Sequence, residues 1–166
     1  EYDKAMESYR KALELDENDV SAYYNRGRIL AYLGRYKEAL KDFTNAINLE
    51  KYDERLLYER AGIFYLMKRY KDALLDYKAF VNLAPHMKEG YLGMADCYCQ
   101  MNQMNNAIEY YNKSIEIDEN DGENYFGIAI CNKELNNFDV VEEYLVKANA
   151  LEPEDNRIIE EYAFEL

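Results

Sequence analysis

Catalysis would require a nucleophile, a base and a group that stabilises developing charge, all brought to one place. The chain has a single histidine, His86, which directly follows Pro85 in a predicted turn. No Ser-His-Asp or Cys-His arrangement can be drawn around it, and no glycine-rich phosphate loop occurs. The sequence therefore predicts a protein that is not an enzyme.

The three cysteines are the next candidates for chemistry, since thiolates bind metals and form disulfides. Cys97 and Cys99 form a Cys-x-Cys pair, and Cys131 follows Cys97 by 34 residues. Metal sites combine such cysteines with further Cys or His ligands at defined spacings, and no Cys or His stands at such a spacing here. Packed helices lie about 8–10 Å apart, so a disulfide between Cys97 and Cys131 is unfavourable. We expect reduced, buried cysteines, and neither a metal nor a cofactor.

Acidic residues outnumber basic ones by 33 to 20, which gives a net charge of −13. Such a charge repels phosphate, so we expect no nucleic-acid partner and no membrane binding. No apolar run approaches the roughly 18 residues of a membrane span. The run Asp118-Glu119-Asn120-Asp121 lacks the Gly and the distal Glu of a calcium loop, and we interpret it as turn and cap residues.

Few cysteines, and an odd number of them, argue against a disulfide framework and favour a reducing compartment. We therefore predict a cytoplasmic location. No signal peptide is evident, but residues 1–2 already continue a helical pattern, which predicts that the chain is a piece of a longer protein.

Matching residues recur every 34 positions along the whole chain. We call each set of positions 34 residues apart a column. One column holds large, mostly aromatic residues: Tyr9, Phe43, Tyr77, Tyr111 and Leu145. Two columns hold small residues: Gly27, Ala61, Ala95, Ala129 and Ala163 in one, and Ala5, Ala39, Ala73, Ala107 and Val141 in the other. Small residues let two helix backbones approach closely, and the large column fills the space beside that contact. The columns thus predict repeated pairs of antiparallel helices.

The first complete pair is expected at 20–33 and 36–50, where apolar residues follow helical spacing. Aspartates recur where the first helix of each pair begins, and Asp is a good N-cap. These are Asp19, Asp53, Asp121 and Asp155, with Met87 breaking the column. The turn inside each pair carries Gly34, Lys68, Asn102 or Asn136, a place that favours residues tolerating the left-handed conformation.

The period of 34, the small eighth residue of each repeat and the Ala–Phe/Tyr–Ala trio resemble the tetratricopeptide repeat (TPR) over the whole chain. The resemblance implies an all-α fold, a right-handed superhelical solenoid of antiparallel helix pairs. We predict a single array over 1–166. Its parts would be a partial repeat at 1–19, full repeats at 20–53, 54–87, 88–121 and 122–155, and a terminal partial helix at 156–166.

In this family the first helix of each pair lines a concave groove, and the groove positions here do not repeat as the core columns do. We predict that the groove binds a peptide segment of a partner protein. The predicted contact residues are Tyr24, Asn25, Arg28, Arg55, Tyr58, Glu59, Tyr65, Asp96 and Phe126. Gly62, Gly93 and Gly127 are expected to leave the floor open.

Two alternatives concern these residues. Each tyrosine could instead pack against the next repeat. Some family members use the groove to clamp the C-terminal carboxylate of heat-shock chaperones, and Asn25 and Arg55 match part of that clamp. Glu59, however, stands where the clamp has an arginine and would repel a carboxylate, so we do not expect this ligand.

The sequence thus favours a non-catalytic scaffold or adaptor that binds a protein or peptide. One alternative is the substrate-recruiting arm of a larger enzyme. Another is a self-associating structural segment, because Tyr2, Met6 and Tyr9 form an apolar stripe on the first helix.

Overall fold

The structure is a computed structural model that describes residues 2–165, so the predicted ends at positions 1 and 166 lie outside the described residues. These residues form ten α-helices and no strand. The helices are α1 (Tyr2–Leu15), α2 (Val20–Tyr32), α3 (Tyr36–Leu49), α4 (Glu54–Leu66), α5 (Tyr70–Leu83), α6 (Lys88–Gln100), α7 (Met104–Ile117), α8 (Gly122–Glu134), α9 (Phe138–Leu151) and α10 (Asn156–Glu165). The predicted all-α class is confirmed.

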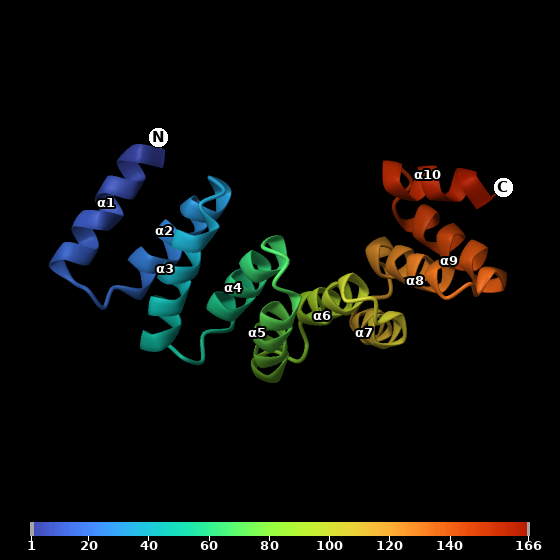
Figure 1. The fold of residues 1–166 in the computed structure, drawn as a ribbon, viewed down its shortest axis with the longest axis horizontal. Coiled ribbons are helices and arrows are strands. Elements are labelled where there is room, and N and C mark those ends of the chain that lie inside the picture. The colour runs from blue at the N-terminus through green and yellow to red at the C-terminus, as the bar shows by residue number, and fades with distance from the viewer. Residues whose placement is uncertain (1, 166) are drawn as a thin grey trace. The chain divides into compact units, whose positions relative to one another are not determined.

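The chain divides into two compact units, unit 1 at Glu1–Ala84 and unit 2 at Pro85–Leu166. In unit 1 the closest packing is between α2 and α3 and between α4 and α5, and α1 packs on α2 (Figure 1). In unit 2 the corresponding pairs are α6 with α7 and α8 with α9, followed by α10 on α9. The grouping of all repeats into one array stays a prediction.

Local signals determine where the helices begin and end. The predicted Asp caps accept hydrogen bonds from backbone N–H groups at the starts of α2, α4, α8 and α10, whereas Met87 provides no side-chain cap for α6. The predicted left-handed positions all have positive φ: Gly34 at 71°, Lys68 at 58°, Asn102 at 59° and Asn136 at 60°. Lys68 has a Cβ and no short polar side chain, so it occupies this conformation least readily.

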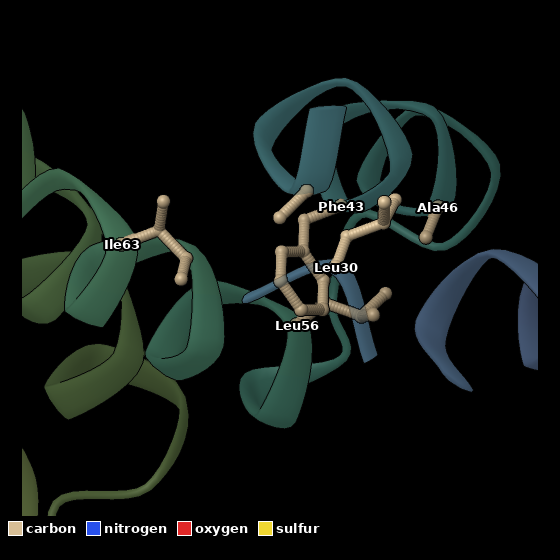
Figure 2. Close-up of a cluster of buried hydrophobic side chains, with 6 residues drawn as sticks. Leu30, Phe43, Ala46, Leu56 and Ile63 are labelled. Atoms are coloured by element: carbon tan, nitrogen blue, oxygen red, sulfur yellow. The ribbon is translucent and has the colours of Figure 1, made fainter. Parts of the chain in front are cut away.

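The core of unit 1 shows why the columns alternate small and large residues. Leu30, Phe43, Ala46 and Leu56 are buried in one cluster with Ile63 (Figure 2). A Cβ added to Gly27 would lie 3.1 Å from the Phe43 ring, a tighter contact than most side chains make. The predicted complementarity between the small and the aromatic columns is therefore confirmed in this pair.

Two ion pairs, each between a half-buried arginine and a buried aspartate, join the helices of unit 1 and were missed in the sequence. Arg26 in α2 binds Asp42 in α3 with two hydrogen bonds of 2.7 Å, and Arg60 in α4 binds Asp76 in α5 at 2.7 and 2.8 Å. The signal was an Arg and an Asp 16 positions apart, repeated 34 residues later. Unit 2 has apolar and aromatic residues at these places: Met94 and Tyr110, and Ile128 and Tyr144.

No helix within residues 2–165 combines the length and the apolar character needed to cross a lipid bilayer.

Candidate functional site

Four predicted groove residues meet around one aromatic ring in unit 1. The Tyr24 ring packs edge-on against Phe43, with the ring centres 6.3 Å apart. The guanidinium carbons of Arg28 and Arg55 lie 5.6 and 5.7 Å from the centre of the Tyr24 ring. The Tyr24 hydroxyl donates a hydrogen bond of 3.3 Å to Glu59. We call Tyr24, Arg28, Arg55 and Glu59 the arginine–tyrosine cluster.

The two arginines of this cluster are open to solvent, with 58% of the Arg28 side chain and 68% of the Arg55 side chain exposed. Arg55 pairs with Asp53 at 2.6 Å, and its hydrogen bonding lowers the pKa of that carboxyl. Arg28 lies 3.4 Å from Glu59, longer than a typical N–H···O hydrogen bond. The Arg28 donors thus remain available to a ligand, beside an aromatic face.

An open cavity of about 710 Å³ adjoins the cluster at Arg55. The α3–α4 connection lines it, from Leu49 to Arg55. Tyr52 lies in this segment with 82% of its surface exposed, which is unusual for so large an apolar ring. Sequence reasoning missed Tyr52. The sequence did carry a signal for it: the equivalent positions of the other repeats hold the polar residues Asn18, His86, Asn120 and Glu154, and only this repeat has an aromatic ring there.

The other predicted tyrosines of unit 1 do not join the cluster. Tyr58 packs on the second helix of its own pair, with ring centres 5.8 Å from Tyr77 and 5.3 Å from Phe80. Tyr65 packs on Tyr70 at 5.4 Å. Through its contacts with Tyr77 and the buried Phe80, Tyr58 extends the core of its own helix pair outward, and the role of both rings in the groove stays a prediction.

Asn25 and the stripe on α1 are also engaged within unit 1. The Asn25 amide donates to the Ser21 carbonyl at 2.8 Å, a bond inside α2 that leaves its side-chain oxygen for a ligand. On the stripe, the Tyr2 ring lies 5.1 Å from the Tyr32 ring, and Met6 packs against the unit 1 core. The stripe is therefore covered in part by α2.

In unit 2, the predicted groove residue Asp96 accepts a hydrogen bond of 2.7 Å from the hydroxyl of Tyr111. The Tyr111 ring reaches Asp96 by crossing Gly127, where an added Cβ would lie 2.3 Å from the ring. The expected open floor is thus wrong at Gly127, because a side chain from α7 fills the space. At Gly62 in unit 1 nothing lies within 4 Å of an added Cβ, so the floor is open there.

Phe126, the last predicted groove residue, lies beside Arg157 of α10, whose guanidinium carbon is 5.5 Å from the ring centre. Arg157 also pairs with Glu123 and with Asp155, each at 2.6 Å. Carboxylate oxygens of Glu123, Glu152 and Asp155 lie within 4.8 Å of one another. Because Arg157 neutralises two of these carboxylates, the group does not indicate a metal site.

Burial raises the pKa of Asp96 to about 6, and repulsion from Glu123 adds to the effect, while the Tyr111 hydrogen bond and Arg157 oppose it. The carboxyl of an Asp in an unfolded chain has a pKa of about 3.9. Because the folded pKa is the higher one, the stability contributed by Asp96 is fully present below about pH 4 and is lost as the pH rises through about 6.

We expect the urea midpoint of unfolding to fall between about pH 4.5 and about pH 7.5 in the natural chain. Asp96→Asn should flatten this fall, because Asn keeps an oxygen for the Tyr111 hydroxyl without titrating. Urea titrations at the two pH values, followed by circular dichroism, check this. An identical change in both proteins would show that other groups cause the pH dependence.

The net charge is divided very unevenly between the units. Unit 1 has 15 acidic and 15 basic residues, whereas unit 2 has 18 acidic and 5 basic residues. Unit 2 therefore carries the whole net charge of −13. The electrostatic potential of unit 2 attracts cations, while unit 1 has no net charge and relies on local groups such as Arg28 and Arg55.

The residues first considered for chemistry have structural surroundings. His86 is exposed, as expected for a turn. Cys97 and Cys131 are buried free thiols, as predicted, and Cys99 is half-buried. The Lys88 ammonium pairs with Asp118 at 2.5 Å and with Asp121 at 2.8 Å, so the acidic run holds a lysine of unit 2.

Sequence comparison identifies the repeat. A family model described as "Tetratricopeptide repeat" matches residues 20–53 and 89–121, and one described as "TPR repeat" matches 1–31. Together they match just over half of the chain. The chain belongs to the tetratricopeptide repeat family. TPR proteins generally serve as non-catalytic interaction modules.

Solved structures agree with this TPR assignment at the level of the fold. A TPR protein from Parabacteroides merdae is 23% identical, with a TM-score of 0.89 over 99% of this chain and 65% of the other. YrrB, described as a TPR protein with an unusual peptide-binding site, is 23% identical, with a TM-score of 0.86 over 99% and 84%. MamA from Desulfovibrio magneticus RS-1 is 22% identical, with a TM-score of 0.87 over 93% and 88%. No curated protein matches the sequence significantly.

Proposed function

We propose that the chain is a non-catalytic adaptor that binds an extended segment of a partner protein at the arginine–tyrosine cluster of unit 1. The observation that carries this proposal is the pair of largely exposed guanidinium groups held against one ring, Tyr24. Arg and aromatic side chains contribute a large share of binding energy at protein interfaces. The ring orients both arginines before a ligand arrives, which lowers the entropic cost of binding.

The chemistry of the cluster selects for an acidic side chain in the partner. A carboxylate between Arg28 and Arg55 would receive charge-assisted hydrogen bonds, which are stronger than neutral ones. Glu59 opposes this ligand in part, but it already accepts from Tyr24 and lies beside Arg28. The adjoining cavity offers Leu49 and the exposed ring of Tyr52 to an apolar neighbour of that carboxylate.

The charge of unit 2 favours a second element in the partner. A basic stretch would be attracted to unit 2, which has 18 acidic residues against 5 basic ones. Asp96 and Phe126 are the predicted contact residues there. A substrate-recruiting role within a larger enzyme, self-association through α1 and a cytoplasmic location stay predictions.

Panning a random peptide library on the chain tests the proposal. We expect enriched peptides to carry Asp or Glu next to an apolar residue. The double substitution Arg28→Gln and Arg55→Gln should weaken the binding of the best peptide at least about tenfold, which corresponds to about 1.4 kcal/mol. Calorimetry measures this change in affinity. The contacts of Arg28 and Arg55 lie at the surface, so the melting temperature should stay nearly constant.

Arg69→Gln is the matched control, because Arg69 is also an exposed arginine of unit 1 and stacks on Phe64 at 4.5 Å. It should leave the affinity unchanged. If the peptides bind the double variant with unchanged affinity and bind the control variant more weakly, the binding surface lies elsewhere on unit 1. We avoid Tyr58 in this test, because its core contacts would mix stability with affinity.

A further inference from the structure

Arg55 of unit 1 and Arg157 of unit 2 hold equivalent places in the repeat, and their surroundings match closely. Each donates its backbone N–H and its Nε to the aspartate two residues earlier, and its Nη2 lies 2.6 Å from the same carboxylate. Each guanidinium carbon also lies near an aromatic ring of the preceding repeat, 5.7 Å from the centre of Tyr24 and 5.5 Å from that of Phe126. The two arginines are therefore held in the same way.

A second carboxylate distinguishes the unit 2 site. Arg157 donates to Glu123 from Nη1 at 3.1 Å and from Nη2 at 2.6 Å. Glu123 stands one repeat before Arg157, and the residue one repeat before Arg55 is the exposed Ser21. The serine side chain ends at Oγ, two bonds short of the carboxylate oxygens of a glutamate. Within residues 2–165, Nη1 of Arg55 has no hydrogen-bond partner.

The unit 2 site shows what an arginine held in this way can still bind. Arg157 retains its hydrogen bonds to Asp155 while its two terminal nitrogens also bind Glu123. The planar fork of a guanidinium matches a carboxylate in bidentate geometry, and such charge-assisted hydrogen bonds are stronger than neutral ones. The pairing of Arg55 with Asp53 is therefore compatible with a second carboxylate at the same guanidinium.

The electrostatic surroundings of the two sites differ in favour of unit 1. Arg28 adds a second cation, 5.6 Å from the centre of the Tyr24 ring, whereas its equivalent in unit 2 is Ile130. Unit 2 also carries the whole net charge of −13, which repels an acidic ligand. An external carboxylate is thus attracted to unit 1, while the matching donors in unit 2 are already bound to Glu123.

We propose that a carboxylate of the partner binds Arg55 over Ser21, in the place that the carboxylate of Glu123 takes against Arg157. The inference rests on the function proposed above, and it locates the acidic residue closer to Arg55 than to Arg28. It also makes Ser21 a residue that determines specificity. A longer acidic side chain at this position would bind Arg55 from within the chain, as Glu123 does with Arg157, and would exclude the partner.

Ser21→Glu tests the proposal by supplying the carboxylate from within the chain. It should weaken the binding of the best acidic peptide from the library at least about tenfold, measured by calorimetry, although both arginines remain. Ser21 is exposed in the first turn of α2, where an acidic residue suits the helix dipole, so the fold should be retained. Ser21→Gln is the matched control, because it has the same length without the charge, and its affinity should stay nearly unchanged. Equal affinities of the two variants overturn the proposal.

A second measurement needs no peptide, so it separates this inference from the proposed function. In Ser21→Glu, NMR titration should give the introduced carboxyl a pKa roughly 0.5 lower than in the double variant that also carries Arg55→Gln, because the guanidinium stabilises the charged form. The same pKa in both variants would show that Arg55 does not bind a carboxylate in this place, and would overturn the inference. A lowered pKa together with the absence of any acidic peptide that binds the natural chain would contradict the proposed function instead.

Discussion

Gly127→Ala is expected to lower the free energy of unfolding of unit 2 by about 2–4 kcal/mol. The new methyl group would lie 2.3 Å from Cζ of Tyr111, a distance that no real contact tolerates. The ring cannot yield easily, because it is buried in the unit 2 core and its hydroxyl is bonded to Asp96. The loss combines overpacking with a weakened buried hydrogen bond. Urea unfolding followed by circular dichroism measures it.

Gly62→Ala is the matched control, since Gly62 also lies inside a helix and nothing surrounds its added Cβ within 4 Å. There the same substitution should stabilise the chain by about 0.5–1 kcal/mol, because Ala favours the helix over the unfolded chain. Adding Tyr111→Leu to Gly127→Ala should restore part of the loss. Leu is the residue found one repeat later, at Leu145. Equal effects of the two glycine substitutions would contradict this account of Gly127.

Asn124→Leu combined with Ser114→Ala is expected to stabilise unit 2 by about 1–3 kcal/mol. Both side chains are fully buried. Within the described residues 2–165, neither the Ser114 hydroxyl nor either end of the Asn124 amide has a hydrogen-bond partner. A buried polar group without a partner loses its hydration and gains nothing in return. Thermal and urea unfolding of the double variant measure the gain.

The repeat provides the inverse experiment in unit 1. Ala46 and Leu56 hold the places that Ser114 and Asn124 hold two repeats later, and they pack in one hydrophobic cluster (Figure 2). Leu56→Asn should therefore destabilise unit 1 by about 3 kcal/mol, through lost burial and an unsatisfied amide. If the double variant in unit 2 proves less stable than the natural chain, the polar pair is satisfied there, and a bridging water is the explanation to pursue.

The fold could be predicted from the sequence because its determinants are local and repeated. An Asp cap, a left-handed turn residue and paired small and large columns each act within one helix pair or between neighbours. These rules predicted the start of α2 at Val20, the end of α3 near Glu50 and the positive φ of Lys68. In a repeat protein each pair contacts only its neighbours, so periodic residues are enough to determine the helix pairs.

The candidate site was predicted only in part. Tyr24, Arg28 and Arg55 do meet, but the sequence treated Tyr58 and Tyr65 as equivalent to Tyr24. Whether such a ring is available depends on the side chains of the second helix in the pair, which Phe80 and Tyr70 supply here. A column of similar residues specifies a position on the helix and does not specify what fills the space in front of it.

The same reason explains the remaining difference in unit 2. A glycine at position 127 predicts open space, yet Tyr111 from α7 occupies it. The sequence alone determined the helices, their pairing and the residues offered on each face. The tertiary structure decided which of those side chains touch, because contact depends on the size and direction of side chains on a second helix.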